Sequence, residues 1–151
     1  MSEATGRSGL LDLARQIATQ AHREQVDKAG VPYITHPTRV AARLHGDDAA
    51  EIVAWLHDVV EDTTVTLDQL AQDFPTFIVA AVDAISRRID EAPNDYYRRV
   101  RANPLARAVK LADIADNSDP RRRAALDHPT QERLNAKYKH ALERLGTRLP
   151  Y

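Results

Sequence analysis

The segment WLHDVVEDT, residues 55 to 63, carries four titratable side chains in an apolar context. His57 and Asp58 are neighbours, and Glu61 and Asp62 follow about one helical turn later. Residues three and four apart share a helix face, so His57 would lie over Glu61, and Asp58 over both acids. Imidazole and carboxylate groups bind divalent metals, and further carboxylates beside a metal can serve a hydrolytic water. The segment therefore predicts a metal site with acid–base chemistry.

One histidine and one aspartate supply only two ligands, so a metal needs others from elsewhere in the chain. The sequence has no cysteine, which leaves nitrogen and oxygen donors. His36 precedes Pro37, and proline suits the first position of a helix and would set the direction of the histidine. Asp113 lies in the apolar stretch VKLADIADN, where an uncompensated carboxylate is costly. His36 and Asp113 are the two further candidate ligands.

Each of these features also has a simpler interpretation. A His-Asp pair is typical of an exposed ion pair, and Glu61 with Asp62 could be a solvated helix end. Asn117, one turn after Asp113, is a common type of helix cap. The run from Arg121 to Arg123 could be a solvated face or a clamp for a polyphosphate. The histidines without a recognisable set of partners are His22, His45, His128 and His140.

The elements that must position these residues are all predicted to be helices. Apolar periodicity, proline and cap residues predict one helix from residue 9 to the middle twenties, a second at 37–46 and a third from 48 into the WLHDVVEDT motif. A fourth helix is predicted to begin at residue 66, and further helices are predicted at 75–88, 94–102, 104–117 and 129–145. Thr66 and Gln69 have the spacing of a capping box. No segment has the period-two pattern of a strand. We expect an all-α bundle of about seven to eight helices, as one domain spanning residues 1–151 with a structured core from about 10 to 145.

Composition limits the partners and the location. The formal net charge of -1 argues against general nucleic-acid binding. No apolar run approaches the roughly 20 residues that a membrane span needs, and the N-terminus lacks a secretory pattern. We therefore expect a cytoplasmic protein with neither a nucleic acid nor a membrane as partner. The sequence leaves the oligomeric state open.

Three ordered motifs carry a family resemblance. AHREQVDKAGVPYITHP, LHDVVEDT and VKLADIADN closely resemble the HD-domain metal phosphohydrolases, over about residues 10 to 145. The nearest branch is that of the RelA/SpoT-type alarmone hydrolases, including their small single-domain members. The resemblance implies an HD-domain helical bundle with a bound metal, usually Mn²⁺. The ligands that it implies are His36, His57, Asp58 and Asp113.

The resemblance also implies an activity. Glu61 and Asp62 would activate or position the attacking water, and Lys28, Tyr33 and Asn117 would lie beside the nucleotide, with Lys110 as a weaker candidate. The implied reaction removes the 3′-pyrophosphate of ppGpp or pppGpp and releases GDP or GTP. The partner would be a small nucleotide.

The sequence departs from this family pattern at two positions. Asp27 stands where these hydrolases commonly have an arginine that packs on the guanine base, and Ile114 replaces a basic residue. Another nucleotide, either an adenosine alarmone or a nucleoside mono- or triphosphate, is therefore an alternative substrate. A metal- or nucleotide-binding module without turnover is a third interpretation, although such a module would have little use for Glu61 and Asp62.

Overall fold

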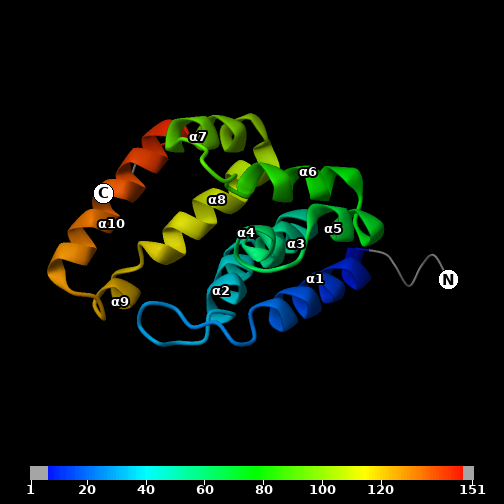
Figure 1. Ribbon diagram of the computed structural model, residues 1–151, viewed down its shortest axis with the longest axis horizontal. Helices are drawn as coiled ribbons and strands as arrows, with labels where there is room; N and C mark the ends of the chain where they lie inside the picture. The colour runs from blue at the N-terminus through cyan, green and yellow to red at the C-terminus, as the bar shows by residue number, and fades with distance from the viewer. Residues whose placement is uncertain (1–6, 148–151) are drawn as a thin grey trace.

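The computed structural model describes residues 7–147, which form an all-α bundle (Figure 1). The helices of seven or more residues are α1 (Arg7–Ala21), α2 (Thr35–Arg43), α3 (Asp48–Leu56), α5 (Leu67–Asp73), α6 (Thr76–Ile85), α7 (Pro93–Ala102), α8 (Pro104–Asn117) and α10 (His128–Arg144). Two helices of four residues are α4 (Val59–Asp62) and α9 (Pro120–Arg123). The predictions of an all-α fold and of about eight main helices are confirmed. No helix in this part of the chain has both the length and the hydropathy to cross a membrane.

Side-chain caps begin several of these helices where the sequence predicts them. The Asp47 carboxylate accepts a hydrogen bond from the Ala50 backbone N–H at the start of α3, at 3.1 Å. Thr66 and Gln69 form the predicted capping box of α5. Asn103 accepts from the Ala106 backbone N–H ahead of α8. These bonds satisfy N–H groups that have no partner within the helix.

Helices α3 and α8 lie at the centre of the fold. Helix α3 packs against α1, α2, α6 and α8, while α8 also contacts α2, α6 and α7. The buried side chains of α3 include Ile52, Val53 and Leu56, which are at most 2% exposed. Both helices carry candidate ligands at or beside their buried faces, so the core holds the backbone of the candidate site in place.

The structure corrects the helix predicted to run through WLHDVVEDT. Helix α3 ends at Leu56, and α4 begins only at Val59. In an unbroken helix the Ala54 carbonyl would accept from the Asp58 backbone N–H. Here it accepts instead from two groups of His57, the backbone N–H at 3.5 Å and the imidazole Nδ1 at 2.6 Å. The break therefore occurs at the two candidate ligands, and the side chains of 57 to 62 do not follow one regular helical face.

Other predicted boundaries also differ from the structure, since α2 ends at Arg43 rather than at residue 46 and α6 ends at Ile85 rather than at residue 88. Helix α1 ends at Ala21, before the middle twenties. Helix α2 begins at Thr35 rather than at Pro37, so His36 lies within its first turn. Proline is tolerated there because the first N–H groups of a helix have no intrahelical acceptor.

Candidate metal centre

The four predicted ligands converge from three parts of the fold. His36 comes from α2, His57 and Asp58 from the break between α3 and α4, and Asp113 from α8. The ligand atoms of His36, His57 and Asp58 lie within 4.8 Å of one another. Asp113 Oδ1 lies 2.8 Å from His36 Nε2 and 3.5 Å from His57 Nε2. His36, His57 and Asp113 are 3%, 2% and 6% exposed, so this cluster is largely withdrawn from water.

The hydrogen bonds of the two imidazoles direct one nitrogen of each ring into the cluster. His57 Nδ1 lies 2.6 Å from the Ala54 carbonyl, which can only accept, so this nitrogen carries the hydrogen. His36 Nδ1 lies 2.7 Å from the Asp116 carboxylate and likewise donates. In a neutral imidazole the opposite nitrogen then presents a lone pair. Both Nε2 atoms face the carboxylates of Asp58 and Asp113, and in the neutral tautomers each would offer a lone pair to a metal ion.

This arrangement fits a divalent cation. His57 Nε2 is buried, and none of the described residues forms a hydrogen bond with it. It lies 3.0 Å from Asp58 Oδ2, where lone pairs of both atoms would repel unless a positive charge lies between them. Two imidazole nitrogens and two carboxylates are a donor set that several divalent transition metals accept. His36, His57, Asp58 and Asp113 could hold such an ion.

Burial and charge act against one another in the cluster. Burial by itself raises the pKa of Asp58, but the charge of the neighbouring His57 lowers that pKa to about 2. Burial also opposes ionisation of Asp113, yet the Lys110 charge and the two imidazoles hold its pKa well below the usual range. The same carboxylates raise the pKa of His57 well above its ordinary value, although burial lowers it. Both carboxylates are therefore ionised, and they favour a positive charge at the two Nε2 atoms, either protons or a metal ion.

Three further side chains contact these carboxylates. The Tyr33 hydroxyl donates to Asp58 Oδ2. Lys110 Nζ donates to Asp113 Oδ2 at 3.0 Å, and Asn117 Nδ2 donates to Asp113 Oδ1 at 3.1 Å. Tyr33 and Asn117, which the family resemblance places beside a nucleotide, thus also orient candidate ligands.

The acidic pair on α4 lies beyond the ligands and is exposed. Glu61 Oε1 accepts a hydrogen bond from the Arg87 backbone N–H at 2.6 Å. Partial burial and the charges of Asp58 and Glu61 raise the pKa of Asp62 to about 6. A carboxylate with a pKa near neutrality can accept and release a proton under ordinary conditions.

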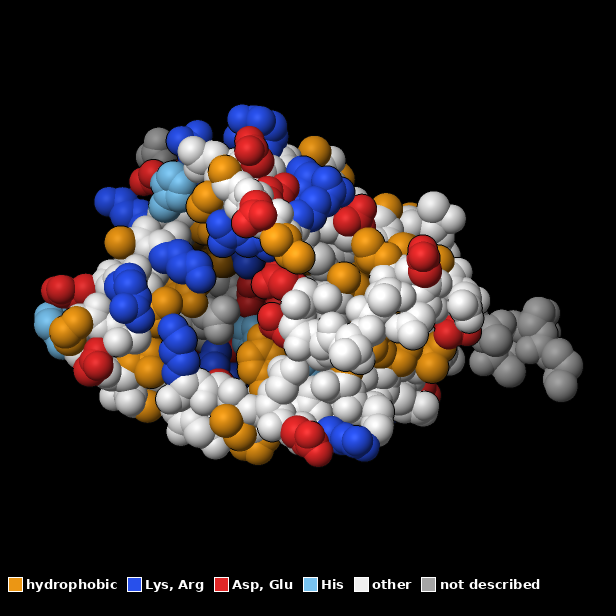
Figure 2. Space-filling view, in the orientation of Figure 1, with side chains coloured by type: hydrophobic (Ala, Val, Ile, Leu, Met, Phe, Trp, Pro, Cys, Tyr) orange, Lys and Arg blue, Asp and Glu red, His pale blue; other side chains and the backbone are white. Residues whose placement is uncertain are grey.

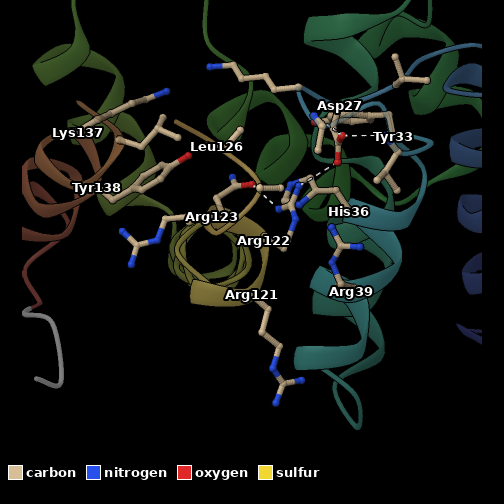
Figure 3. Close-up of a pocket in the computed structure, with 17 residues that line it drawn as sticks. Asp27, Tyr33, His36, Arg39, Arg121, Arg122, Arg123, Leu126, Lys137 and Tyr138 are labelled. Atoms are coloured by element: carbon tan, nitrogen blue, oxygen red, sulfur yellow. Dashed lines mark hydrogen bonds and ion pairs between the residues drawn. The ribbon is translucent and has the colours of Figure 1, made fainter. Parts of the chain in front are cut away.

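A cavity of about 580 Å³ opens beside His36, bounded by the loop of residues 26–33, α9 and α10 (Figure 3). Tyr33, His36 and Asn117 line it and also belong to the cluster, so the two are continuous. The basic residues among those that line it are Lys28, Arg39, Arg121, Arg122, Arg123 and Lys137. Figure 2 shows the hollowed face, with acidic side chains in its floor and basic side chains along one side. The cavity suits a polyanion, and α9 brings the Arg121–Arg123 run to its wall.

Asp27 is the one acid among the described residues that line this cavity. Its Oδ1 accepts from the backbone N–H groups of Ala29 and Val31, at 2.9 and 3.0 Å. Its Oδ2 lies 3.4 Å from Arg122 Nη2. Asp27 therefore shapes the loop and pairs with an arginine of the opposite wall.

Sequence reasoning missed Asp116 and Arg39, and it considered Arg122 only as part of the Arg121–Arg123 run. Asp116 is 1% exposed and contacts the imidazole, while Arg39 and Arg122 contact Asp116. One signal was available, because Asp116 lies three residues after Asp113 on the same helix. Nothing in the chain around Arg39 or Arg122 indicates their common partner, which tertiary packing alone brings between them.

Comparison with known proteins places this geometry in a family. The family described as HD domain matches residues 14–110, which is more than half of the chain. The chain belongs to the HD-domain family. The resemblance identified from the three sequence motifs is thereby confirmed.

Individual HD-domain relatives point to nucleotide enzymes. The chain is 36% identical over 132 residues to the guanosine-3′,5′-bis(diphosphate) 3′-pyrophosphohydrolase of Haemophilus influenzae, covering 80% of this chain and 20% of that protein. It is 32% identical over 117 residues to the protein of the same name from Aquifex aeolicus, covering 69% of this chain and 16% of that one. A GTP pyrophosphokinase of Streptomyces coelicolor is 34% identical over 119 residues, with 71% and 14% covered. The chain thus spans a fifth or less of the length of these relatives.

A solved structure shows the same fold. Its title reads "A metazoan ortholog of SpoT hydrolyzes ppGpp and plays a role in starvation responses". It superposes with a TM-score of 0.76 at 22% sequence identity, covering 92% of this chain and 87% of that one. The helical arrangement described above is therefore that of a solved protein structure.

Proposed function

We propose that this protein is a metal-dependent phosphohydrolase of nucleotide polyphosphates. The proposed reaction removes the 3′-pyrophosphate of ppGpp or pppGpp and leaves GDP or GTP. One observation carries the proposal: two imidazole Nε2 atoms and two ionised carboxylates meet at a buried point that opens into a cavity with six basic side chains. The names of the relatives from Haemophilus influenzae and Aquifex aeolicus support the same reaction.

The proposed ligands are His36, His57, Asp58 and Asp113, and the proposed ion is Mn²⁺. When bound, the metal supplies a water of lowered pKa and offsets phosphate charge. The protein contributes rigidity, because the ligands leave buried helices and the other nitrogen of each imidazole is tied by a hydrogen bond.

The residues around the ligands have separate proposed roles. Asp62, with a pKa of about 6, would accept the proton of the attacking water. Glu61, fixed at one oxygen by the Arg87 backbone N–H, would position that water through its other oxygen. Lys28, Tyr33 and Asn117 would bind substrate, since all three line the cavity. The charges of the cavity would attract the phosphate groups.

Asp27 favours a second candidate function. Its carboxylate lies in the wall of the cavity, where a base or sugar would pack, and it supplies negative charge in place of a cation. An HD-domain phosphohydrolase acting on an adenosine alarmone or on a nucleoside mono- or triphosphate fits this wall as well. Both candidates use the same metal ligands and the same acidic pair.

A substrate panel separates the two. Purified protein with Mn²⁺ is incubated with ppGpp, its adenosine counterpart, GTP, ATP and monophosphates, and the products are separated by anion exchange. The proposal expects pyrophosphate from ppGpp, with the ordinary nucleotides left intact. A preference for any other compound replaces it with the second candidate. The Asp58→Ala variant is the control, because any activity that it retains would come from a contaminant. In that case the protein itself would be a binding module without turnover.

A further inference from the structure

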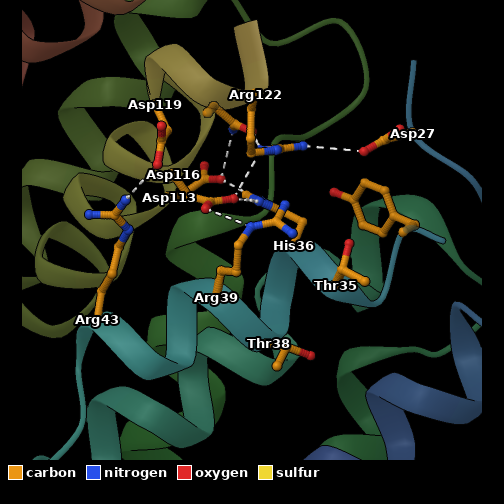
Figure 4. Close-up of polar contacts among 12 residues, drawn as sticks. Asp27, Thr35, His36, Thr38, Arg39, Arg43, Asp113, Asp116, Asp119 and Arg122 are labelled. Carbon is orange, nitrogen blue, oxygen red and sulfur yellow. Dashed lines mark hydrogen bonds and ion pairs between the residues drawn. The ribbon is translucent and has the colours of Figure 1, made fainter. Parts of the chain in front are cut away.

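The carboxylate of Asp116 lies on the opposite side of the His36 ring from the candidate metal position (Figure 4). Its Oδ2 is 2.7 Å from His36 Nδ1, whereas His36 Nε2 faces Asp113. Asp116 is 1% exposed, so water does not satisfy it. It therefore acts on the imidazole from a closed environment.

Two arginines also donate hydrogen bonds to the carboxylate of Asp116. Arg39 Nε donates to Oδ1 at 2.8 Å, and Arg122 Nη1 donates to Oδ2 at 2.9 Å. A buried carboxylate without partners would be strongly disfavoured, so these two charges are what allow Asp116 to remain ionised there. Because both oxygens already have donors, Asp116 is also held back from turning toward the metal position.

Helices α2 and α8 face each other with matched pairs of residues. His36 and Arg39 are three apart on α2, and Asp113 and Asp116 are three apart on α8, so each pair shares one face of its helix. Asp113 meets His36 at Nε2, while Asp116 bridges His36 and Arg39. The two aspartates of α8 thus contact opposite edges of a single imidazole.

We propose that Asp116 is a positioning residue that fixes His36 as a metal ligand through Nε2, and that Arg39 and Arg122 hold Asp116 in place. The proposal rests on the metal centre of the proposed function. A carboxylate at Nδ1 keeps the hydrogen on that nitrogen, stops the ring from flipping and makes Nε2 a better donor. Metal affinity then depends on a residue that never touches the metal.

Arg122 connects Asp116 to residues that line the cavity. It also donates to Asn117 Oδ1 at 2.9 Å and pairs with Asp27 Oδ2 at 3.4 Å, and both partners line the cavity. Among the described residues, Asp116 is the one side chain to which Arg39 donates. Arg39 lines the cavity as well, so loss of either arginine should affect both the metal and the substrate.

The test measures Zn²⁺ affinity by competition with a chromophoric chelator, together with the ¹H–¹⁵N histidine spectrum of the Zn²⁺-loaded protein. The variants are Asp116→Asn, Arg39→Gln and Arg122→Gln. Arg43→Gln is the matched control, because Arg43 lies one turn further along α2 and makes only a long, exposed pair with Asp119 at 3.8 Å. Circular dichroism checks that each variant is folded.

We expect Asp116→Asn to weaken Zn²⁺ binding by roughly 10- to 100-fold. The His36 signal with a protonated Nδ1 should be lost or shifted, while Arg43→Gln should match the wild type. Arg39→Gln and Arg122→Gln should each weaken Zn²⁺ binding and also raise KM, because both side chains line the cavity. A folded Asp116→Asn variant with wild-type Zn²⁺ affinity and an unchanged His36 signal overturns the positioning role alone. A wild type that binds no Zn²⁺ through His36 overturns the metal centre as well.

Discussion

Arg99 holds the loop that supports one of the two proposed catalytic acids. Its guanidinium donates to both oxygens of Glu91 at 2.7 Å and to the backbone carbonyls of Asp83 and Ser86 at 3.1 and 3.0 Å. These four bonds tie residues 83 to 91 to α7. The same loop presents the Arg87 backbone N–H to Glu61. Substituting Arg99 should therefore affect both stability and activity.

The Arg99→Lys variant keeps the charge but loses the planar fork, so one ammonium can replace only part of this set. Arg99 is 22% exposed and Glu91 10%, which lets water compensate some of the loss. Bonds that involve a charged group contribute about 1.5–3 kcal/mol each, so losing two or three of them with partial compensation should cost about 2–4 kcal/mol. For a chain of this size we expect a Tm lower by roughly 5–15 °C. With Glu61 less firmly placed, kcat should fall by roughly 10- to 100-fold.

The loss of stability at acid pH is a second, independent test of the role of Arg99. The hydrogen bonds of Arg99 lower the pKa of Glu91 from 4.5 to about 2. A depressed carboxyl pKa contributes stability above pH 4.5 that is lost as pH falls toward about 2. Arg99→Lys should lose part of this contribution, so the difference from the wild type should be full above pH 4.5 and should shrink below it.

The assay is thermal and urea unfolding across pH, with kcat measured on the same preparations. Arg98→Lys is the matched control, since Arg98 is 79% exposed and pairs only with Asp95 at 3.3 Å. That variant should unfold within about 0.5 kcal/mol of the wild type. The reasoning is refuted if Arg99→Lys unfolds like Arg98→Lys, or if it is destabilised while kcat stays at the wild-type value.

Three other predictions concern the site and its support. Asp62→Asn should lower kcat by roughly 10²- to 10⁴-fold. The wild type should lose activity below about pH 6, because Asp62 is protonated there. Equal pH profiles of activity for both proteins would contradict this role of Asp62. Leu56→Ala, at a side chain that is 0% exposed beside the ligands, should cost about 2–5 kcal/mol in urea unfolding, whereas Ile89→Ala, at a residue that is 94% exposed, should change little. Chelating a metal present at about 100 times its Kd should remove about 2.7 kcal/mol of stability, read as a lower Tm, and His57→Ala should not respond.

Helix ends with strong local signals could be predicted from the sequence. Helix α8 runs from Pro104 to Asn117 as predicted, because Asn103 caps it and proline is favoured at its first position. The break after Leu56 could not be predicted. Val59 and Val60 continue the apolar period of α3, whereas at the break the Ala54 carbonyl accepts from the His57 backbone N–H and imidazole, which the sequence pattern does not indicate.

The candidate site was predictable by residue type rather than by geometry. The convergence of His36, His57, Asp58 and Asp113 agrees with the ligand set that the family motifs imply, but the tautomers follow from partners such as Asp116 and the Ala54 carbonyl. Those contacts arise from the packing of α2 on α8, which one sequence does not reveal. The assignment of residues 1–151 to a single domain, the cytoplasmic location and the absence of a nucleic-acid partner stay predictions.

The most direct test of the account is an anomalous difference map from crystals of the protein soaked in Mn²⁺. The account predicts one strong peak within coordinating distance of His36 Nε2, His57 Nε2 and the carboxylates of Asp58 and Asp113, at the end of the cavity. It also predicts that this peak disappears in the His57→Ala variant. Strong anomalous density elsewhere with none at this cluster, or a peak that survives the substitution unchanged, would contradict the account.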